Sequence, residues 1–249
     1  MRAMVHKNMH PEVSVIIPIH NEEKILTDAL TSLVHRLDQF CPPYEILLME
    51  NGSKDGTAET ARKLSHSFPQ VKAFSGGAPD YGRALKEGIQ HARGKYCLCD
   101  EIDICDVDFY RSALGLMQSG RAEMVVGSKL APGARDERPL MRNLASRTLC
   151  LLLKVGAGLR GTDTHGPKGF IRERLLPIVE RCRLDGNLFA SELVLRAERA
   201  GIEITELPLS LREKRAPTIN LLRRVPSALR DLGKLVWMIR REDVFGENK

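Results

Sequence analysis

Four carboxylates crowd into one short stretch of this chain, "LCDEIDICD" at residues 98–106. Asp100, Glu101, Asp103 and Asp106 follow an apolar run that is typical of a buried strand. Like charges repel, so such a cluster needs a reason: a solvated loop, the capping of a helix, or a cation among the carboxylates. Hard divalent cations prefer oxygen ligands of this kind. The stretch is therefore the first candidate for chemistry.

Two further polar clusters, residues 20–23 and 50–53, follow apolar runs of the same kind. In open α/β sheets, ligands bind beyond the carboxyl ends of parallel strands, which meet at one edge of the sheet. One such cluster alone is equally well explained as a solvated loop at the end of a strand. Three clusters expected at the same edge favour a binding site.

Strand and helix patterns alternate along the first hundred residues and position these clusters. Short apolar runs predict strands, and apolar residues at helical spacing predict the helices between them. The predicted strands are 13–19, 44–50, 71–76 and 95–100, and the predicted helices are 23–37, 53–68 and 81–94. This alternation predicts an α/β fold with a doubly wound, mostly parallel sheet flanked by helices.

Composition and charge exclude several classes of protein. A chain of 249 residues, 43% of them hydrophobic, buries a sizeable core, which excludes a disordered or fibrous protein. The net charge of +6 predicts an anionic partner, but an aromatic content of 5% offers little stacking surface for nucleic acid. We expect no nucleic-acid partner; phosphorylated small molecules or an anionic membrane fit the charge at least as well.

The cysteines and the apolar runs bear on the compartment. The six cysteines form no CxxC pair and no zinc-finger spacing with histidine, and the first ten residues lack the apolar core of a signal peptide. The longest apolar runs are far shorter than the ~20 residues that cross a bilayer. We expect a protein of the reducing cytoplasm, with or without peripheral contact to the cytoplasmic face of a membrane. Self-association stays open.

Two common nucleotide-binding motifs are absent from the sequence. No G-x-G-x-x-G follows the first predicted strand, which disfavours a dinucleotide-binding Rossmann fold. Residues 77–84, "GAPDYGRA", have the glycine spacing of a P-loop, but Arg83 and Ala84 stand where lysine and Ser/Thr are needed. We interpret this stretch as a loop that opens a helix.

Six stretches occur in the order and spacing of a known family. They are "VSVIIPIHNEE", "ENGSKDGT", "EIDICD", "GSKLAPGARDERPLMRNLASR", "DTHGPKGF" and "ASELVLRAERAGIEITELPL". Together they resemble the family 2 glycosyltransferases, and most closely the polyprenyl or dolichyl phosphate sugar synthases. The resemblance implies a GT-A fold over residues 13–215, with a nucleotide-sugar half at 13–108 and an acceptor half at 109–215. An N-terminal tail (1–12) and a C-terminal basic segment (216–249) flank this domain.

The resemblance implies that the acidic cluster binds a metal. A divalent cation, Mn²⁺ or Mg²⁺, would neutralise the charge that grows on a nucleoside diphosphate as it leaves. Glu101, Asp103 and Asp106 fall on the family's three acidic positions, and Glu101 departs from the usual aspartate. Capping of the following helix by Asp106 and Asp108 is the alternative.

The same resemblance implies two sets of binding residues. Those for the donor nucleotide are Pro18, Asn21, Glu22, Glu50, Asn51, Ser53 and Asp100. Because Glu50 and Asn51 replace the family's usual pair of aspartates, uracil and guanine both stay open as the base. Those for an acceptor phosphate are Arg142, Arg147, Lys168 and Arg215.

Glu192 lies where the family carries a glutamate on a helix, and it is our first candidate for a catalytic base, followed by Asp185. The alternative is that Glu192 pairs with Arg196, four residues on, along an exposed helix face. An acceptor phosphate is already ionised at neutral pH and needs cations rather than a base. We therefore expect Lys168 and Arg147 to matter more for activity than Glu192.

The implied function is inverting transfer of a sugar from a nucleotide-sugar donor to a lipid-linked phosphate. Two alternatives stay open. The acceptor could be a soluble or glycan hydroxyl, or the protein could bind nucleotides without turnover. The departures at Glu50, Asn51 and Glu101 motivate the second alternative.

Residues 221–241 carry an amphipathic, basic pattern. At 100° per residue, one arc collects the apolar residues Leu222, Val225, Leu229, Leu232, Val236 and Ile239, opposite basic residues. Such a helix binds anionic membranes, and we expect deletion of the residues after 216 to abolish that binding. Docking of the apolar arc on the catalytic domain or on a second subunit is the alternative.

Overall fold

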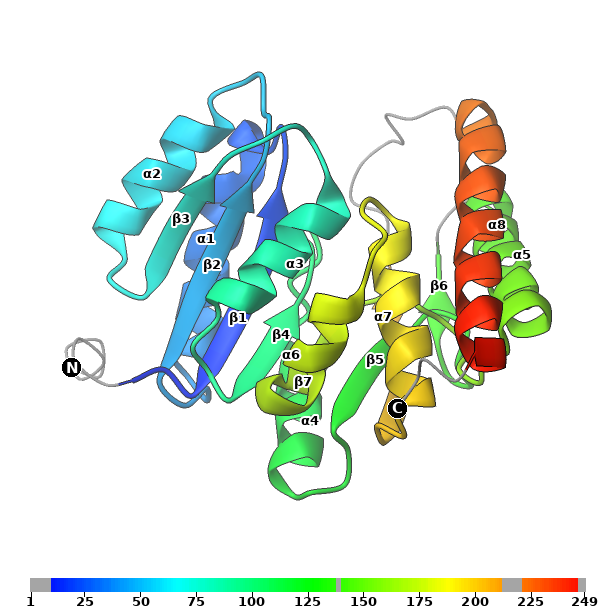
Figure 1. Cartoon of the computed structure of the whole chain (residues 1–249). Coiled ribbons are helices and arrows are strands. Elements are labelled where there is room, and N and C mark those ends of the chain that lie inside the picture. The colour runs from blue at the N-terminus through cyan, green and yellow to red at the C-terminus, as the bar shows by residue number, and fades with distance from the viewer. Residues whose placement is uncertain (1–9, 138–139, 212–220, 246–249) are drawn as a thin grey trace.

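The computed structural model describes residues 10–137, 140–211 and 221–245, which form an α/β structure around a central sheet (Figure 1). Its strands are β1 (Val13–Ile19), β2 (Tyr44–Glu50), β3 (Val71–Ser75), β4 (Tyr96–Cys99), β5 (Met124–Ser128), β6 (Arg135–Asp136), β7 (Lys168–Ile171), β8 (Ile204–Pro208) and β9 (Ser210–Leu211). Its helices are α1 (Glu23–Leu37), α2 (Thr57–Ser67), α3 (Tyr81–His91), α4 (Val107–Gln118), α5 (Leu140–Ala157), α6 (Arg172–Arg181), α7 (Leu188–Arg199) and α8 (Leu221–Phe245).

The main sheet has seven strands in the order β3-β2-β1-β4-β7-β5-β8, and β6 pairs with β9 in a small second sheet. Strands β3, β2, β1 and β4 are mutually parallel, and β5 is parallel to β8. Strand β7 is antiparallel to both of its neighbours, β4 and β5. The predicted doubly wound, mostly parallel sheet is therefore confirmed, with one reversed strand, β7, between β4 and β5.

Helices cover both faces of the sheet, each set above its own hydrophobic core. Along β1, Val15 and Ile17 face the core that α1, α2 and α4 close, whereas Ile16 faces the core that α3, α6 and α7 close. A strand buried on both faces needs apolar side chains in both directions. Gly88 of α3 lies against Ile16, where a Cβ would collide, so this glycine sets how closely helix and sheet approach.

One predicted helix start is corrected and another is confirmed. Helix α2 begins at Thr57 rather than at residue 53; the Asp55 carboxylate accepts the Thr57 N–H at 3.0 Å just before the helix. Asp80 caps α3 by accepting the Arg83 N–H at 2.8 Å. Residues 77–84 thus form a loop that opens a helix, as the sequence predicted.

The C-terminal helix α8 packs on the domain. Leu232, Leu235, Met238 and Ile239 are buried in the core that α7 also lines. Docking of the apolar arc on the domain, the alternative stated above, is therefore confirmed for Leu232, Val236 and Ile239. On the same arc, Leu229 is exposed, and the side chains of residues 222 and 225 lie outside the described part of the helix.

A buried ion network joins α8 to α7. The Arg196 guanidinium donates to both Glu242 oxygens at 2.6 and 2.9 Å and to Glu192 at 2.8 Å. All three side chains are buried. The predicted pairing of Glu192 with Arg196 is confirmed, but the exposed helix face expected for it is wrong, because α8 covers this part of α7.

If α8 is an integral part of the core, Leu235→Ala destabilises the protein by about 2–5 kcal/mol through the lost burial and the cavity left behind. Trp237→Ala on the exposed side of the same helix changes the free energy of unfolding by about 0.5 kcal/mol or less. Urea unfolding followed by circular dichroism measures both. Equal, small effects of the two substitutions would mean that α8 does not contribute to the folded core.

Candidate active site

The candidate residues gather at one rim of the sheet, where β1, β2, β4 and β5 end and the reversed strand β7 begins (Figure 1). Lys168, the first residue of β7, pairs with Cys99, the last residue of β4. The three polar clusters predicted at strand ends therefore do share an edge with residues from the second half of the chain.

The loops after β1 and β2 are tied together at this rim. Asn21, with a positive φ of 56°, donates its N–H to the Ser53 hydroxyl at 3.0 Å, and its side-chain oxygen accepts the Lys54 N–H at 2.8 Å. The Glu22 N–H donates to the Thr57 hydroxyl at 2.8 Å. Pro18 is half-buried near the end of β1. The predicted donor residues of the first two loops are thus brought together.

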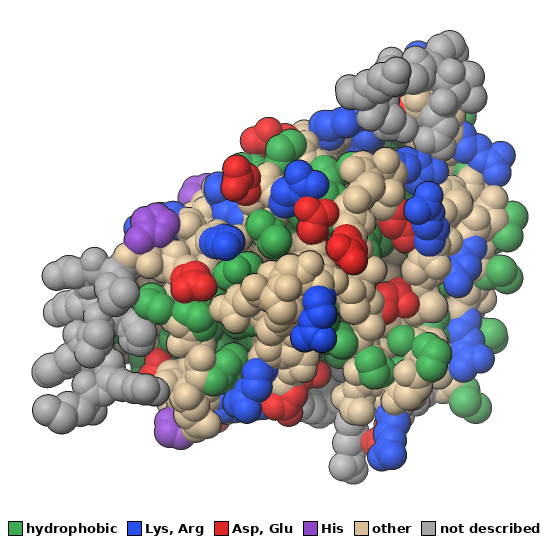
Figure 2. Space-filling model, turned by 90° about the horizontal axis from the view of Figure 1, so that it is seen from below, with side chains coloured by type: hydrophobic (Ala, Val, Ile, Leu, Met, Phe, Trp, Pro, Cys, Tyr) green, Lys and Arg blue, Asp and Glu red, His purple; other side chains and the backbone are tan. Residues whose placement is uncertain are grey.

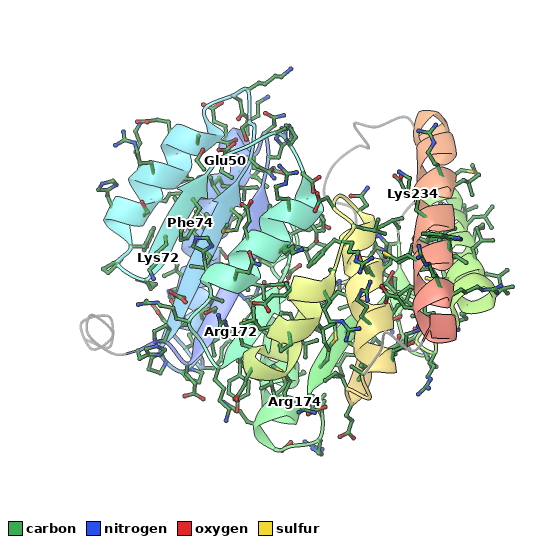
Figure 3. All side chains as sticks on the ribbon, in the orientation of Figure 1. Glu50, Lys72, Phe74, Arg172, Arg174 and Lys234 are labelled. Carbon is green, nitrogen blue, oxygen red and sulfur yellow. The ribbon has the colours of Figure 1, made fainter. Side chains whose placement is uncertain are left out.

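Glu50 and Asn51 lie side by side at the end of β2 and border a cavity of about 170 Å³. Burial alone would raise the pKa of Glu50, but hydrogen bonds from Ser75 and Ser53 outweigh it, so its pKa lies below the usual value. Phe74, labelled with Glu50 in Figure 3, also lines this cavity. An ionised acceptor next to an aromatic wall is suited to a planar group that carries an N–H.

Asp100 organises the acidic loop from inside. Its carboxylate is buried and accepts the Glu101 N–H at 2.8 Å and the Asp106 N–H at 2.9 Å. Burial raises the pKa of Asp100 to about 7. Asp106 caps α4: its carboxylate accepts the N–H groups of Asp108 at 3.1 Å and of Phe109 at 3.0 Å. The capping alternative for Asp106 therefore describes its observed contacts.

Glu101 and Asp103 are the two other acids of this loop. Glu101 is exposed, yet the protein atoms packed around its carboxyl and the negative charge of Asp103 raise its pKa. Asp103 lines a cavity of about 600 Å³ beside the loop. A nearby cation favours the ionised form of a carboxylate such as Glu101, whose pKa is raised.

Among the described residues, no three His, Cys, Asp or Glu side chains cluster to hold a metal by themselves. Mg²⁺ is commonly held by one or two carboxylates, with phosphate oxygens and water completing its shell. Glu101 and Asp103 fit that kind of site, in which the ligand supplies the remaining oxygens.

The second half of the chain brings buried positive charge to the same rim. Lys129, directly after β5, forms a buried ion pair with Asp163 at 2.8 Å. Asp163 also accepts the N–H of His165 at 2.9 Å, and the charge of Lys129 outweighs burial and lowers the pKa of Asp163. Sequence reasoning missed Lys129, although its place after the apolar run "MVVGS" is the same signal that identified the other strand ends.

Lys168 is buried at the start of β7 and donates to the Gly166 carbonyl at 2.8 Å. Burial lowers the pKa of its ammonium group to about 8, and burial with the charges of Lys168 and Lys129 lowers the pKa of His165 to about 4. His165 is therefore neutral at pH 7. Lys168 is the one predicted acceptor residue whose described side chain lies at the rim.

The other predicted catalytic and acceptor residues are more dispersed. Glu192 is buried and accepts the N–H groups of Arg183 and Leu184 at 2.7–3.0 Å, in addition to Arg196. Asp185 lies in the loop before α7 and pairs with Arg83 at 3.5 Å.

Three predicted acceptor residues lie on or beyond α5. Arg147 is exposed on this helix and donates to Asn143 at 2.8 Å. The side chain of Arg142 on α5 and the whole of Arg215 lie outside the described residues. Their predicted contact with a phosphate stays a prediction.

Comparison with known proteins gives a family match and several relatives. Residues 14–172 match the model of Glycosyl transferase family 2. The glycosyltransferase AglD of Haloferax volcanii is 26% identical over 218 residues, covering 85% of this chain and 35% of AglD. The dolichyl-phosphate beta-glucosyltransferase of Saccharomyces cerevisiae is 27% identical over 244 residues, covering 85% of this chain and 72% of that protein. The chain thus spans about a third of the first relative and about three quarters of the second.

Solved structures share the fold at low sequence identity. Glucosyl-3-phosphoglycerate synthase from Mycobacterium tuberculosis, in complex with UDP, superposes with a TM-score of 0.65 at 18% identity, covering 92% of this chain and 82% of that one. Mannosyl-3-phosphoglycerate synthase from Rubrobacter xylanophilus gives 0.65 at 18% identity, covering 99% and 78%. These similarities confirm the GT-A type fold.

The buried ammonium of Lys168 predicts a specific pH dependence of stability. Its pKa is about 8 in the folded protein and near 10.5 when unfolded, so the unfolded chain binds more protons between these values. Relative to Lys168→Met, the parent gains about 3 kcal/mol as the pH rises from 8 to 10.5. Urea unfolding of both proteins across this range measures the difference. A constant difference would show that Lys168 titrates normally.

Proposed function

The chain belongs to glycosyl transferase family 2, and we propose that it moves a sugar, with inversion, from a nucleotide-sugar donor to the phosphate of a polyprenyl or dolichyl lipid. One observation carries the proposal: the same rim holds the carboxylates of Glu101 and Asp103 and the buried ammonium groups of Lys129 and Lys168. The first pair suits a cation with its diphosphate, and the second suits a phosphate. Relatives named dolichyl-phosphate beta-glucosyltransferase support the lipid acceptor.

The donor nucleotide would occupy the side of the rim formed by β1 and β2. The cavity beside Glu50 and Asn51 offers a charged acceptor for a base N–H and the aromatic face of Phe74. The linked loops at Asn21 and Ser53 would border the ribose or the diphosphate. The M. tuberculosis synthase was also crystallised with Mn²⁺ and UDP-glucose, which supports this class of donor for the shared fold.

A divalent cation, Mn²⁺ or Mg²⁺, would be held by Glu101 and Asp103 and would neutralise the diphosphate as the bond to the sugar breaks. The chain's own residues keep the two carboxylates in place. Asp100 fixes the loop through two backbone N–H groups, and Asp106 anchors the loop's end to α4.

The described residues favour a phosphate over a hydroxyl as the attacking group. A hydroxyl needs a general base within reach. His165 has a pKa near 4, which makes it a weak base, and both Glu192 oxygens already accept backbone and guanidinium N–H groups. A phosphate is ionised without help, and the ammonium groups of Lys129 and Lys168 would orient it.

Asp103→Asn tests the cation. We expect Mn²⁺-dependent binding of nucleoside diphosphate to weaken at least tenfold, because one carboxylate ligand is lost. Asp28→Asn, an exposed acid on α1, is the matched control and should bind as the parent does. Isothermal titration with UDP and GDP, with and without Mn²⁺, measures binding and identifies the base. Parent-like Mn²⁺ dependence in Asp103→Asn would contradict the assignment.

Lys168→Met tests the acceptor. We expect kcat/KM for a water-soluble, short-chain polyprenyl phosphate to fall about a hundredfold, as for loss of one preorganised charge, while affinity for nucleoside diphosphate stays within threefold. Lys95→Met, at the opposite end of β4, is the control and should keep parent activity. Equal losses of donor and acceptor affinity in Lys168→Met would assign this lysine to the donor instead.

A further inference from the structure

Helix α5 is apolar on two opposite sides. Its inner side, with Leu153 and Ala157, is buried in the core. On its outer side Leu140, Leu151, Leu144 and Val155 fall within an arc of roughly 60°, and each is 59–86% exposed. Helices that are apolar all round are normally buried on all sides. The outer side of α5 therefore has the composition of a covered surface.

The exposed apolar surface continues onto α8. The two helices pack side by side, with Val236 against Gly156 and the Arg240 guanidinium donating to the Gly156 carbonyl at 2.7 Å. Leu229 and Trp237 on α8 are 53% and 63% exposed. We call outer face the surface formed by Leu140, Met141, Leu144, Leu151, Val155, Leu229 and Trp237. All the large hydrophobic side chains that the structure describes as exposed, Leu152 included, lie on these two helices.

Basic side chains border the outer face along both edges. Helical geometry puts Arg147 and Lys154 next to the apolar arc of α5, on the side away from α8. It puts Arg230, Lys234 and Arg241 on the far edge of α8, and all five are exposed. Hydrophobic and basic side chains alternate along the edge of the molecule at the right of Figure 2, and Lys234 is labelled on α8 in Figure 3.

Negative charge is scarce on this surface. Helix α5 contains no Asp or Glu, and within the described side chains of α8 Glu242 is buried and Asp231 lies 3.8 Å from Lys234. A second copy of the chain docked face to face would set these basic edges against each other. An anionic lipid bilayer complements both the apolar centre and the basic borders.

Chain connectivity links the outer face to the acceptor side of the rim. Helix α5 lies between Lys129 and Lys168 in the sequence, and residues 130–139 and 158–167 connect it to these two rim positions. No described helix has the length and apolar character to cross a membrane.

We propose that the outer face docks on an anionic bilayer, with the apolar centre at the acyl boundary and the basic edges on the headgroups. The proposal extends the proposed function, since a lipid phosphate has its tail in the bilayer and its headgroup at the rim. It differs from the expectation drawn from the sequence, because the buried side of α8 holds the helix on the domain and its exposed side, with α5, meets the lipid.

Trp237 provides a direct readout, because it is the single tryptophan of the chain. With vesicles of phosphatidylcholine and phosphatidylglycerol, we expect its emission to shift to the blue and to be quenched by brominated acyl chains. Vesicles of phosphatidylcholine alone should give a much weaker effect, and high salt should reverse binding. An unchanged Trp237 spectrum in the presence of vesicles that bind the protein would place the contact elsewhere.

Vesicle co-sedimentation of point variants measures the apolar and the basic contributions of the outer face separately. Leu144→Ser with Val155→Ser should weaken partitioning at least tenfold through lost apolar burial. Arg147→Gln with Lys154→Gln should weaken it about thirtyfold. Arg62→Gln with Lys63→Gln on α2 removes the same charge from exposed positions and should change it little. Equal partitioning of the apolar double variant and the parent would overturn the proposal.

Two further measurements keep this result distinct from the proposed function. Affinity for nucleoside diphosphate, unchanged in the apolar double variant, shows that its fold and donor site are intact. If the parent protein transfers sugar to a water-soluble polyprenyl phosphate but does not sediment with vesicles, the proposed membrane surface is wrong and the proposed activity is still supported. If light scattering shows that the parent is a dimer and that the same apolar substitutions dissociate it, a second copy of the chain covers the outer face instead of a bilayer.

Discussion

The reversed strand β7 is the constraint on which the candidate site depends. Because β7 runs antiparallel between β4 and β5, its first residue, Lys168, lies opposite Cys99 at the edge where the parallel strands end. A parallel strand in this position would bring its last residue there instead. The reversal also delivers the preceding loop, with Asp163, to Lys129 at the end of β5. Basic groups from the second half thereby meet acidic groups from the first half at one rim.

Burial drives the charged groups of this rim toward their neutral forms. It raises the pKa of Asp100 to about 7 and lowers that of Lys168 to about 8, close to neutral pH in both cases. A phosphate near Lys168 favours the ammonium form, and a cation near Glu101 favours the carboxylate. Under the proposed function, a bound phosphate and cation would offset these effects of burial, and their binding would be coupled to the protonation of Lys168 and Glu101.

Sequence patterns located the rim, but they did not predict every residue at the rim or the long-range contacts of α8. The rule that ligands lie beyond strand ends found Glu50 and Asp100, and it applies equally to Lys129, which was missed because a single lysine after "MVVGS" forms no cluster. Periodicity identified the apolar arc of α8 correctly, yet it says which residues are apolar and not which surface covers them. The burial of Glu192 depends on α8, which contributes Glu242 from far along the chain. Long-range partners of this kind leave no local signal.

The buried network around Arg196 makes α8 part of the same framework as the donor side of the rim. Glu192 accepts from Arg196 and from the N–H groups of the loop before α7. In that loop the Gly186 N–H donates to the Asp80 carboxylate at 2.8 Å, and the Asp80 carbonyl accepts from the Asn51 amide at 2.5 Å.

Breaking one partner of a buried ion pair costs about 3–5 kcal/mol, so these contacts hold α8 firmly on the domain. Helix α5 packs into the same core through Leu153 and Ala157, and it lies between Lys129 and Lys168 in the sequence. The two helices that carry the outer face are thus both packed on the domain. The packing of these helices on the domain, and not a linker, therefore sets the orientation of the outer face relative to the rim.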